Sequence, residues 1–112
     1  MPVTSLPIGL ILIVVNAATA TGLANSTQFT LQARPDGSDR TLSLQATGTY
    51  TVCTADLEQS LDGGVTFNVL KAGMDLFAAK LQQQLNIGPG PVLQVNIKTF
   101  TGTSVTVRAV AS

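Results

Sequence analysis

The sequence predicts an all-β domain, an antiparallel β-sandwich of a jelly-roll-like kind with an extended N-terminal arm or strand. The chain has 112 residues, which suits one domain with a buried core. Apolar residues make up 45% of it and aromatic residues only 4%, so the core has to consist of Val, Leu, Ile and Ala. Its many β-branched and turn residues favour strands over helices. Seven or eight short alternating runs at regular spacing are typical of two packed antiparallel sheets.

Charge is scarce and balanced. The chain has six Lys and Arg residues in total and six Asp and Glu residues, and it has no His. A net charge of zero provides no electrostatic basis for binding nucleic acid or an anionic membrane, so neither is expected as a partner. A surface with few charges costs little to desolvate, and a net charge near zero promotes association. We therefore expect an assembled protein rather than a free monomer.

The most hydrophobic segment lies near the N-terminus, at residues 8–15. It is too short to span a bilayer, and residues 1–7 lack the Lys or Arg of a signal peptide. Its Ile and Val content fits a buried strand, while Pro2 and Pro7 favour an extended arm. A segment this apolar promotes aggregation when it is exposed. We therefore expect it to pack in the core or against a neighbouring subunit. The residues predicted to form this inter-subunit arm are Leu10, Ile11, Leu12, Ile13, Val14 and Val15.

A boundary is expected after this segment. Residues 16–25 are rich in Ala, Thr and Gly and form a linker or a weakly patterned strand. We therefore separate an N-terminal arm or strand with its linker, 1–26, from a β-sandwich domain, 27–112. Two alternating runs, 28–33 and 41–46, flank a polar loop with a Pro-Asp-Gly turn signal, and they are predicted to pair as a hairpin or as adjacent strands.

The centre of the chain is predicted to form a tight hairpin. After a break at Thr47-Gly48, residues 49–59 read as one long strand, in which Leu57 and Leu61 share the apolar face. Asp62-Gly63-Gly64 then turns the chain, and residues 65–70 lead out of the turn.

The next segment, residues 72–87, fits two patterns. Met74, Phe77 and Leu81 fall at helical spacing, whereas residues 81–87 also alternate as a strand does. We expect a strand over 80–87 and a loop or one helical turn over 72–79.

The last part of the chain is predicted to form a C-terminal hairpin. Gly88-Pro89-Gly90-Pro91 is a break, and two alternating runs follow it at 92–100 and 104–111. A short turn, Thr101-Gly102-Thr103, separates them.

Catalytic chemistry is poorly represented. Asp56 and Glu58 share a strand face, as the acid and nucleophile of a glycosidase can, but we interpret the pair as part of the exposed polar face of a strand. The single cysteine, Cys53, forms neither an internal disulfide nor a metal site and reads as a small buried hydrophobe. No zinc spacing, nucleophile elbow or phosphate-binding glycine loop occurs. We predict no enzyme activity, no catalytic residue, no metal and no cofactor.

The central turn resembles the Asp-box of sialidases and other β-propellers. Ser60, Asp62, Gly64 and Phe67 fit the pattern Ser-x-Asp-x-Gly-x-x-aromatic. In those proteins the Asp-box is a structural hairpin remote from catalysis, and each blade repeats it, whereas this chain has one copy. We therefore predict only a structural turn, in which Asp62 accepts backbone N–H groups, the glycines take positive φ and Phe67 packs beneath.

A second resemblance covers residues 27–112. A strand ending in Ser-Leu-Asp-Gly-Gly, a Gly-Pro break and paired runs such as Val92–Ile97 and Ser104–Val107 look like small β-sandwich virion proteins of tailed bacteriophages. Many of that group have Trp where Phe67 stands. The resemblance implies a non-enzymatic capsid cement or decoration protein, made in the host cytoplasm and placed on the capsid surface of the virion.

The same resemblance implies the partners: the major capsid protein and further copies of the chain, in a homo-oligomer such as a trimer. Two alternatives remain open. One is a carbohydrate- or receptor-binding module, although such sites present stacking aromatic residues and most aromatics here have core parity. The other is a head–tail or tail adaptor subunit.

Overall fold

The computed structural model describes residues 3–32, 40–77, 83–87 and 90–112. These residues form strands and turns without a helix, which confirms the all-β class, and they accordingly contain no helix able to cross a membrane. Seven strands make one mixed sheet in which β1, β3, β7, β4 and β5 lie in that order, with β2 also on β7 and β6 also on β4. The strands are β1 (Val3–Leu6), β2 (Ile11–Ala18), β3 (Gln28–Leu31), β4 (Arg40–Ser60), β5 (Asn68–Asp75), β6 (Gln83–Ile87) and β7 (Val92–Ala111).

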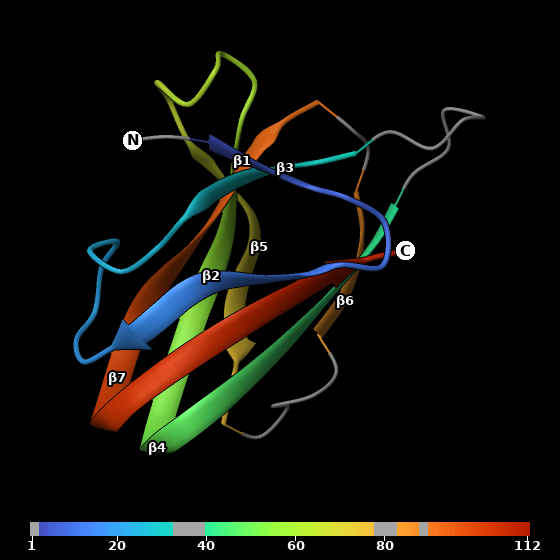
Figure 1. Cartoon of the computed structure of the whole chain (residues 1–112). Coiled ribbons are helices and arrows are strands. Elements are labelled where there is room, and N and C mark those ends of the chain that lie inside the picture. Colours follow the sequence, from blue (N-terminus) through green and yellow to red (C-terminus); the bar gives the residue numbers. More distant parts are fainter. Residues whose placement is uncertain (1–2, 33–39, 78–82, 88–89) are drawn as a thin grey trace.

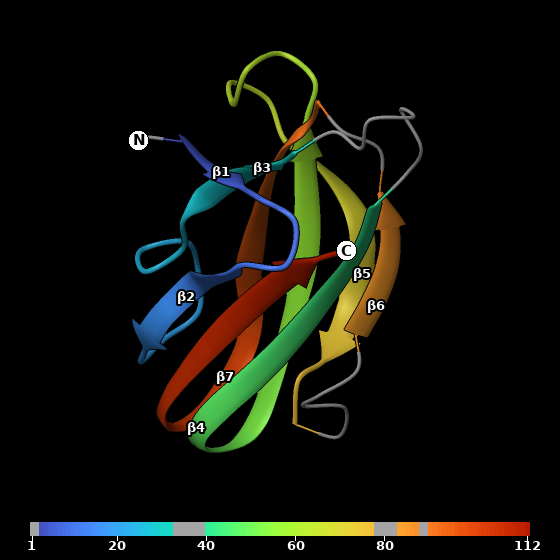
Figure 2. The same ribbon diagram turned by 45° about the vertical axis from the view of Figure 1, so that its right-hand side comes forward.

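Two long strands, β4 and β7, organise the sheet. They pair antiparallel from Leu42 and Ala111 at one end to Ser60 and Val92 at the other. Each is one continuous strand, yet both turn back sharply about halfway along (Figures 1 and 2). The first half of β4 pairs with the second half of β7 and with β6, while its second half pairs with the first half of β7 and with β5. The sheet is thereby folded over, and both halves contribute to one apolar core.

Glycine is required at two positions of this bend. Gly48 and Gly102 have positive φ angles of 138° and 154°. A Cβ atom on Gly48 would meet the carbonyl oxygen of Ser104, and one on Gly102 would meet the Cα atom of Tyr50. The register of the pair shifts beside them, between Thr49 and Tyr50. The two backbones therefore stay paired through the bend because no side chain stands between them.

The continuity of these strands corrects two predictions. Residues 92–100 and 104–111 are not a hairpin, because they belong to one strand whose halves each pair with β4. The predicted break at Thr47-Gly48 is wrong as well, since β4 runs unbroken from Arg40 to Ser60. In both places a glycine lies between two alternating runs. It bends the strand toward the other half of the sheet, and the two runs do not pair with each other as they would in a hairpin.

The pairing of β3 is also different from the prediction. Residues 28–33 and 41–46 are not neighbours, because β3 lies between β1 and β7 in the sheet. Turn signals indicate where a chain reverses but not which strand it then joins. The expected polar loop between the two runs falls mainly on residues 33–39, outside the described residues.

The ambiguous segment resolves into two strands. Residues 72–75 complete β5, so the predicted loop or helical turn is wrong there, and Leu76 and Phe77 form a turn. The predicted strand over 80–87 is confirmed for 83–87, which form β6. The remainder, 78–82, lies outside the described residues.

The N-terminal segment belongs to the same sheet. β2 pairs antiparallel with the second half of β7, and β1 pairs in parallel with β3. The N-terminal region, predicted as an arm or strand with a linker, thus supplies two strands, β1 and β2, to the sheet. The largest fully buried side chains come from all parts of the chain and are Phe29, Leu6, Leu42, Leu44, Leu57, Met74, Leu76, Leu93, Ile97, Val14 and Val15.

Candidate functional site

The apolar segment at residues 10–15 is divided between the core and the surface. Val14 and Val15 are fully buried, and Leu12 packs partly against the core. Leu10, Ile11 and Ile13 are exposed, and Ile11 retains 68% of its accessible area. The segment therefore holds β2 in its own sheet and also presents aliphatic side chains to solvent.

Strand register places the exposed residues of β2 in rows across the sheet. Ile11 pairs with Val110 of β7, which pairs with Ser43 of β4. Ile13 pairs with Arg108, which in turn pairs with Gln45. Side chains two residues apart on a strand share a face, so both rows lie on the outer face of this half of the sheet.

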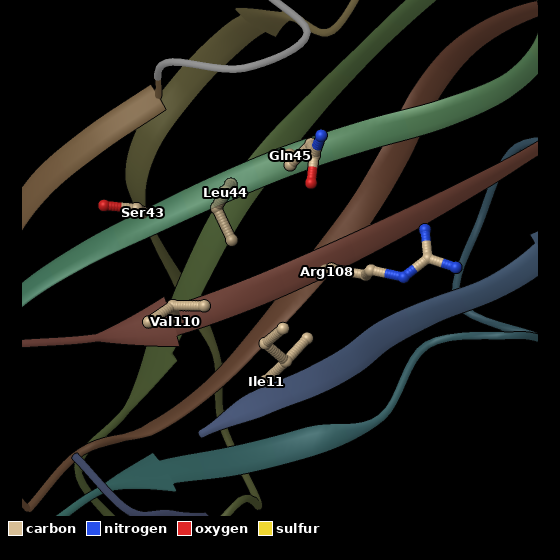
Figure 3. A pocket seen from close by; sticks show the side chains of 6 residues that line it. All are labelled: Ile11, Ser43, Leu44, Gln45, Arg108 and Val110. Carbon is tan, nitrogen blue, oxygen red and sulfur yellow. The ribbon is translucent and has the colours of Figure 1, made fainter. Parts of the chain in front are cut away.

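A hollow of about 300 Å³ lies between these rows, and we call it the outer groove. Figure 3 shows side chains from three strands around it. The Nη1 atom of Arg108 donates a hydrogen bond of 2.8 Å to Oγ1 of Thr47. The bond ties the guanidinium to β4, while the aliphatic stem of the arginine lies beside the groove. The residues lining the outer groove are Ile11, Ser43, Leu44, Gln45, Arg108 and Val110.

The turn between β4 and β5, residues 60–67, is held by side-chain hydrogen bonds. The hydroxyl of Ser60 donates to Oδ1 of Asp62 over 2.5 Å and accepts from the amide of Gly64 over 2.9 Å. Oδ1 of Asp62 also accepts the amides of Val65, at 3.2 Å, and Thr66, at 2.9 Å. The structure thus brings together Ser60, Asp62 and Gly64 as an Asp-box-like turn requires, and we call residues 60–67 the Asp-box turn.

The other residues of the Asp-box turn differ in backbone conformation and in exposure to solvent. Gly63 and Gly64 have positive φ angles of 80° and 96°, and Phe67 is half-buried. Leu61 and Val65 project into solvent with 82% and 83% of their accessible area exposed. In a continued strand, alternation would place these residues on an apolar face. However, β4 ends at Ser60, so residues beyond it no longer alternate between the two faces of a sheet. Exposure of these two residues is therefore a feature that the sequence pattern does not show.

Hydrogen bonding in the turn lowers the pKa of Asp62 to about 2 from its ordinary value of 3.8, chiefly through the hydroxyl of Ser60 and the amide of Thr66. A folded-state pKa below the unfolded one stabilises the folded protein above about pH 4, and this contribution is lost as the pH falls through about 2. We expect the free energy of unfolding to decrease over that window and to decrease less in Asp62→Asn. Urea titrations at several pH values measure it, and an identical pH profile for the two proteins would contradict the assignment.

The pair of acidic residues considered for glycosidase chemistry is engaged in the sheet. Oδ1 of Asp56 accepts the amide of Gly73 over 2.9 Å. The two oxygens of Glu58 accept Nε2 of Gln94 over 2.7 Å and Nδ2 of Asn96 over 3.1 Å. These bonds tie β4 to β5 and β7, so the arrangement holds strands together. Within the described part of the chain, no three His, Cys, Asp or Glu side chains cluster as metal ligands do.

The remaining reactive groups are protected. Cys53 is buried, and burial together with the charge of Asp75 raises the pKa of its thiol to about 11, which makes it a poor nucleophile at neutral pH. The hydroxyl of Tyr50 donates to the carbonyl of Leu76 over 2.7 Å, and burial raises its pKa. Phe77 packs edge-on against the Tyr50 ring with centroids 6.1 Å apart.

Comparisons with known proteins yielded no relative of this chain: no family model, no curated protein and no solved structure matches it.

Proposed function

We propose that this chain is a structural virion protein of a tailed bacteriophage, of the capsid cement or decoration kind, and that it works by contact. The single observation that carries the proposal is the exposure of three aliphatic side chains, Leu10, Ile11 and Ile13, at and just before the start of β2 on a protein with few charges. The folded-over sheet supports the finer assignment to jelly-roll-like sandwiches, because its two halves enclose one core.

Burial of these aliphatic side chains accounts for the proposed mechanism. A large aliphatic side chain moved from water into an apolar contact contributes about 1.5–3 kcal/mol. Ile11 lines the outer groove, and Leu10 and Ile13 are exposed close to it in the chain, so a subunit that covers the groove and its surroundings buries them together. A subunit that binds only the assembled shell stabilises that shell by mass action.

The aromatic residues favour this proposal over a carbohydrate-binding module. Sugar-binding sites present aromatic rings for stacking. Phe29 and Tyr50 are buried, Phe67 and Phe100 are half-buried, and only Phe77 is exposed. One exposed ring that already packs on Tyr50 makes a poor platform for a sugar.

The experiment is cosedimentation of the purified chain with heads of the phage that encodes it. We expect the chain to pellet with the heads and Ile11→Ser and Ile13→Ser each to bind about tenfold more weakly, because each substitution removes one buried aliphatic side chain. Val52→Ser is the matched control, since Val52 is an exposed aliphatic residue of β4 away from the outer groove. A wild-type chain that stays in the supernatant, or equal weakening by Val52→Ser, would overturn the proposal.

A further inference from the structure

We infer that the outer groove receives the Asp-box turn of a second copy of this chain, in a head-to-tail contact. The inference rests on the proposed function, which holds that the chain works through subunit contacts, and it names the partner of the groove. Leu61 and Val65 of one copy pack on Ile11 and Val110 of the next, and Asp62 faces Arg108.

The Asp-box turn has the properties of an inserting element. It projects beyond the body of the sheet as the loop between β4 and β5 (Figures 1 and 2). Its tip carries the two most exposed large hydrophobic side chains of the described residues, Leu61 and Val65. Four backbone amides donate hydrogen bonds to the hydroxyl of Ser60 and to Oδ1 of Asp62, and these bonds fix the backbone that bears them. A preordered loop loses little conformational entropy on docking, so more of the burial energy remains as affinity.

The outer groove is the complementary partner. Ile11 and Val110 provide an apolar floor, and the hollow of about 300 Å³ between the rows is open to solvent. Ser43, Gln45 and the guanidinium of Arg108 supply polar groups at its margin. An apolar centre with a polar rim is the usual composition of a protein interface.

Charge selects the head-to-tail arrangement over the symmetric ones. The carboxylate of Asp62 lies at the exposed tip of the turn and carries a negative charge there. Arg108 has its bond to Thr47 and no carboxylate partner in the described parts of the chain. Turn against turn would oppose two Asp62 carboxylates, and groove against groove would oppose two Arg108 guanidinium groups. Only turn against groove joins opposite charges, and like charges at an interface are unfavourable.

One chain does not fill its own groove. The Asp-box turn leaves the far end of the second half of β4, whereas the groove lies on the outer face of the half formed by β2, the end of β7 and the start of β4 (Figures 1 and 2). The contact is therefore between copies, and it uses two different patches. Such a heterologous contact produces a ring when its rotation closes, and an open filament when it does not.

A mixing experiment tests the contact with two variants in sedimentation velocity. Leu61→Ser removes an apolar contact of the turn and keeps the groove intact. Ile11→Ser removes an apolar contact of the groove and keeps the turn intact. Wild-type chain should oligomerise, and each variant alone should associate about tenfold more weakly because every copy carries the same defect. An equimolar mixture should recover a one-to-one heterodimer, since one intact turn then meets one intact groove. Val52→Ser, the control, should oligomerise as the wild type does.

Further outcomes separate this inference from the proposed function. A mixture that stays monomeric, or an Ile11→Ser protein that oligomerises like the wild type, would overturn the head-to-tail contact. Asp62→Asn keeps the acceptor oxygen of the turn, and its association should weaken about fivefold and depend less on salt. Heads that bind a strictly monomeric chain would reject the inference and leave the proposed function standing. Recovery of the heterodimer without head binding would support the inference and reject the function.

Discussion

Replacing Gly102 with alanine should lower the free energy of unfolding by at least about 3 kcal/mol. The new Cβ would overlap the backbone of Tyr50, and no side-chain rotation relieves an overlap with backbone atoms. Position 102 also has a φ of 154°, at the edge of the region that favours glycine. Gly48→Ala should behave in the same way, because its Cβ would meet the carbonyl oxygen of Ser104.

Urea unfolding followed by circular dichroism measures both substitutions. Gly9→Ala is the matched control, because Gly9 has a φ of 77° but no atom within 4 Å of its added Cβ. It should cost only about 1–2 kcal/mol of conformational strain. If Gly102→Ala were no more destabilising than Gly9→Ala, the close crossing of β4 and β7 would not exist in solution.

Removing residues 1–15 should abolish cooperative folding. The deletion takes away β1 and most of β2, and with them the buried Val14 and Val15. Each of these valines contributes about 1.5–3 kcal/mol by burial, against a total stability of about 5–15 kcal/mol for a typical domain. The deletion also exposes the edge of β7 that pairs with β2, and a free apolar edge promotes aggregation.

The exposed half of the same segment should behave differently. Ile11→Ser and Ile13→Ser should change the free energy of unfolding by no more than about 0.5 kcal/mol, because their side chains face solvent. Thermal unfolding and size-exclusion chromatography of the three proteins compare the two halves. A truncated protein with a wild-type unfolding transition would show that β2 is dispensable to the core.

Local features of this protein follow well from its sequence. The Asp-box turn depends on Ser60, Asp62 and the glycines beside them, all within eight residues, so its hydrogen bonds are formed by neighbours in the chain. The alternation of Leu42, Leu44 and Ala46 identifies a strand with one buried face, because a strand places every second side chain on the same side. The all-β class rests on many such runs together.

The surfaces on which the proposals rest are harder to predict from the sequence. The apolar run at 8–15 has one composition throughout, yet Val14 and Val15 enter the core while Ile11 and Ile13 face solvent. A register shift between Ile13 and Val15 produces this division, and it depends on pairing with β7, about ninety residues away. The outer groove likewise needs three strands that are distant in the chain, so no local pattern indicates it.

The all-β class, the central turn and the balanced charge can be predicted from the sequence, because each depends on residue type or on contacts between near neighbours. The roles of Gly48 and Gly102 depend instead on contacts between parts of the chain that are distant in sequence. Each glycine lies between two alternating runs. This local pattern is compatible both with a hairpin and with one long strand that bends across a folded sheet. The choice depends on the partner strand, since β4 and β7 bend together and their backbones cross where neither glycine carries a side chain. That shared bend folds the sheet over and leaves the outer face of β2 to solvent.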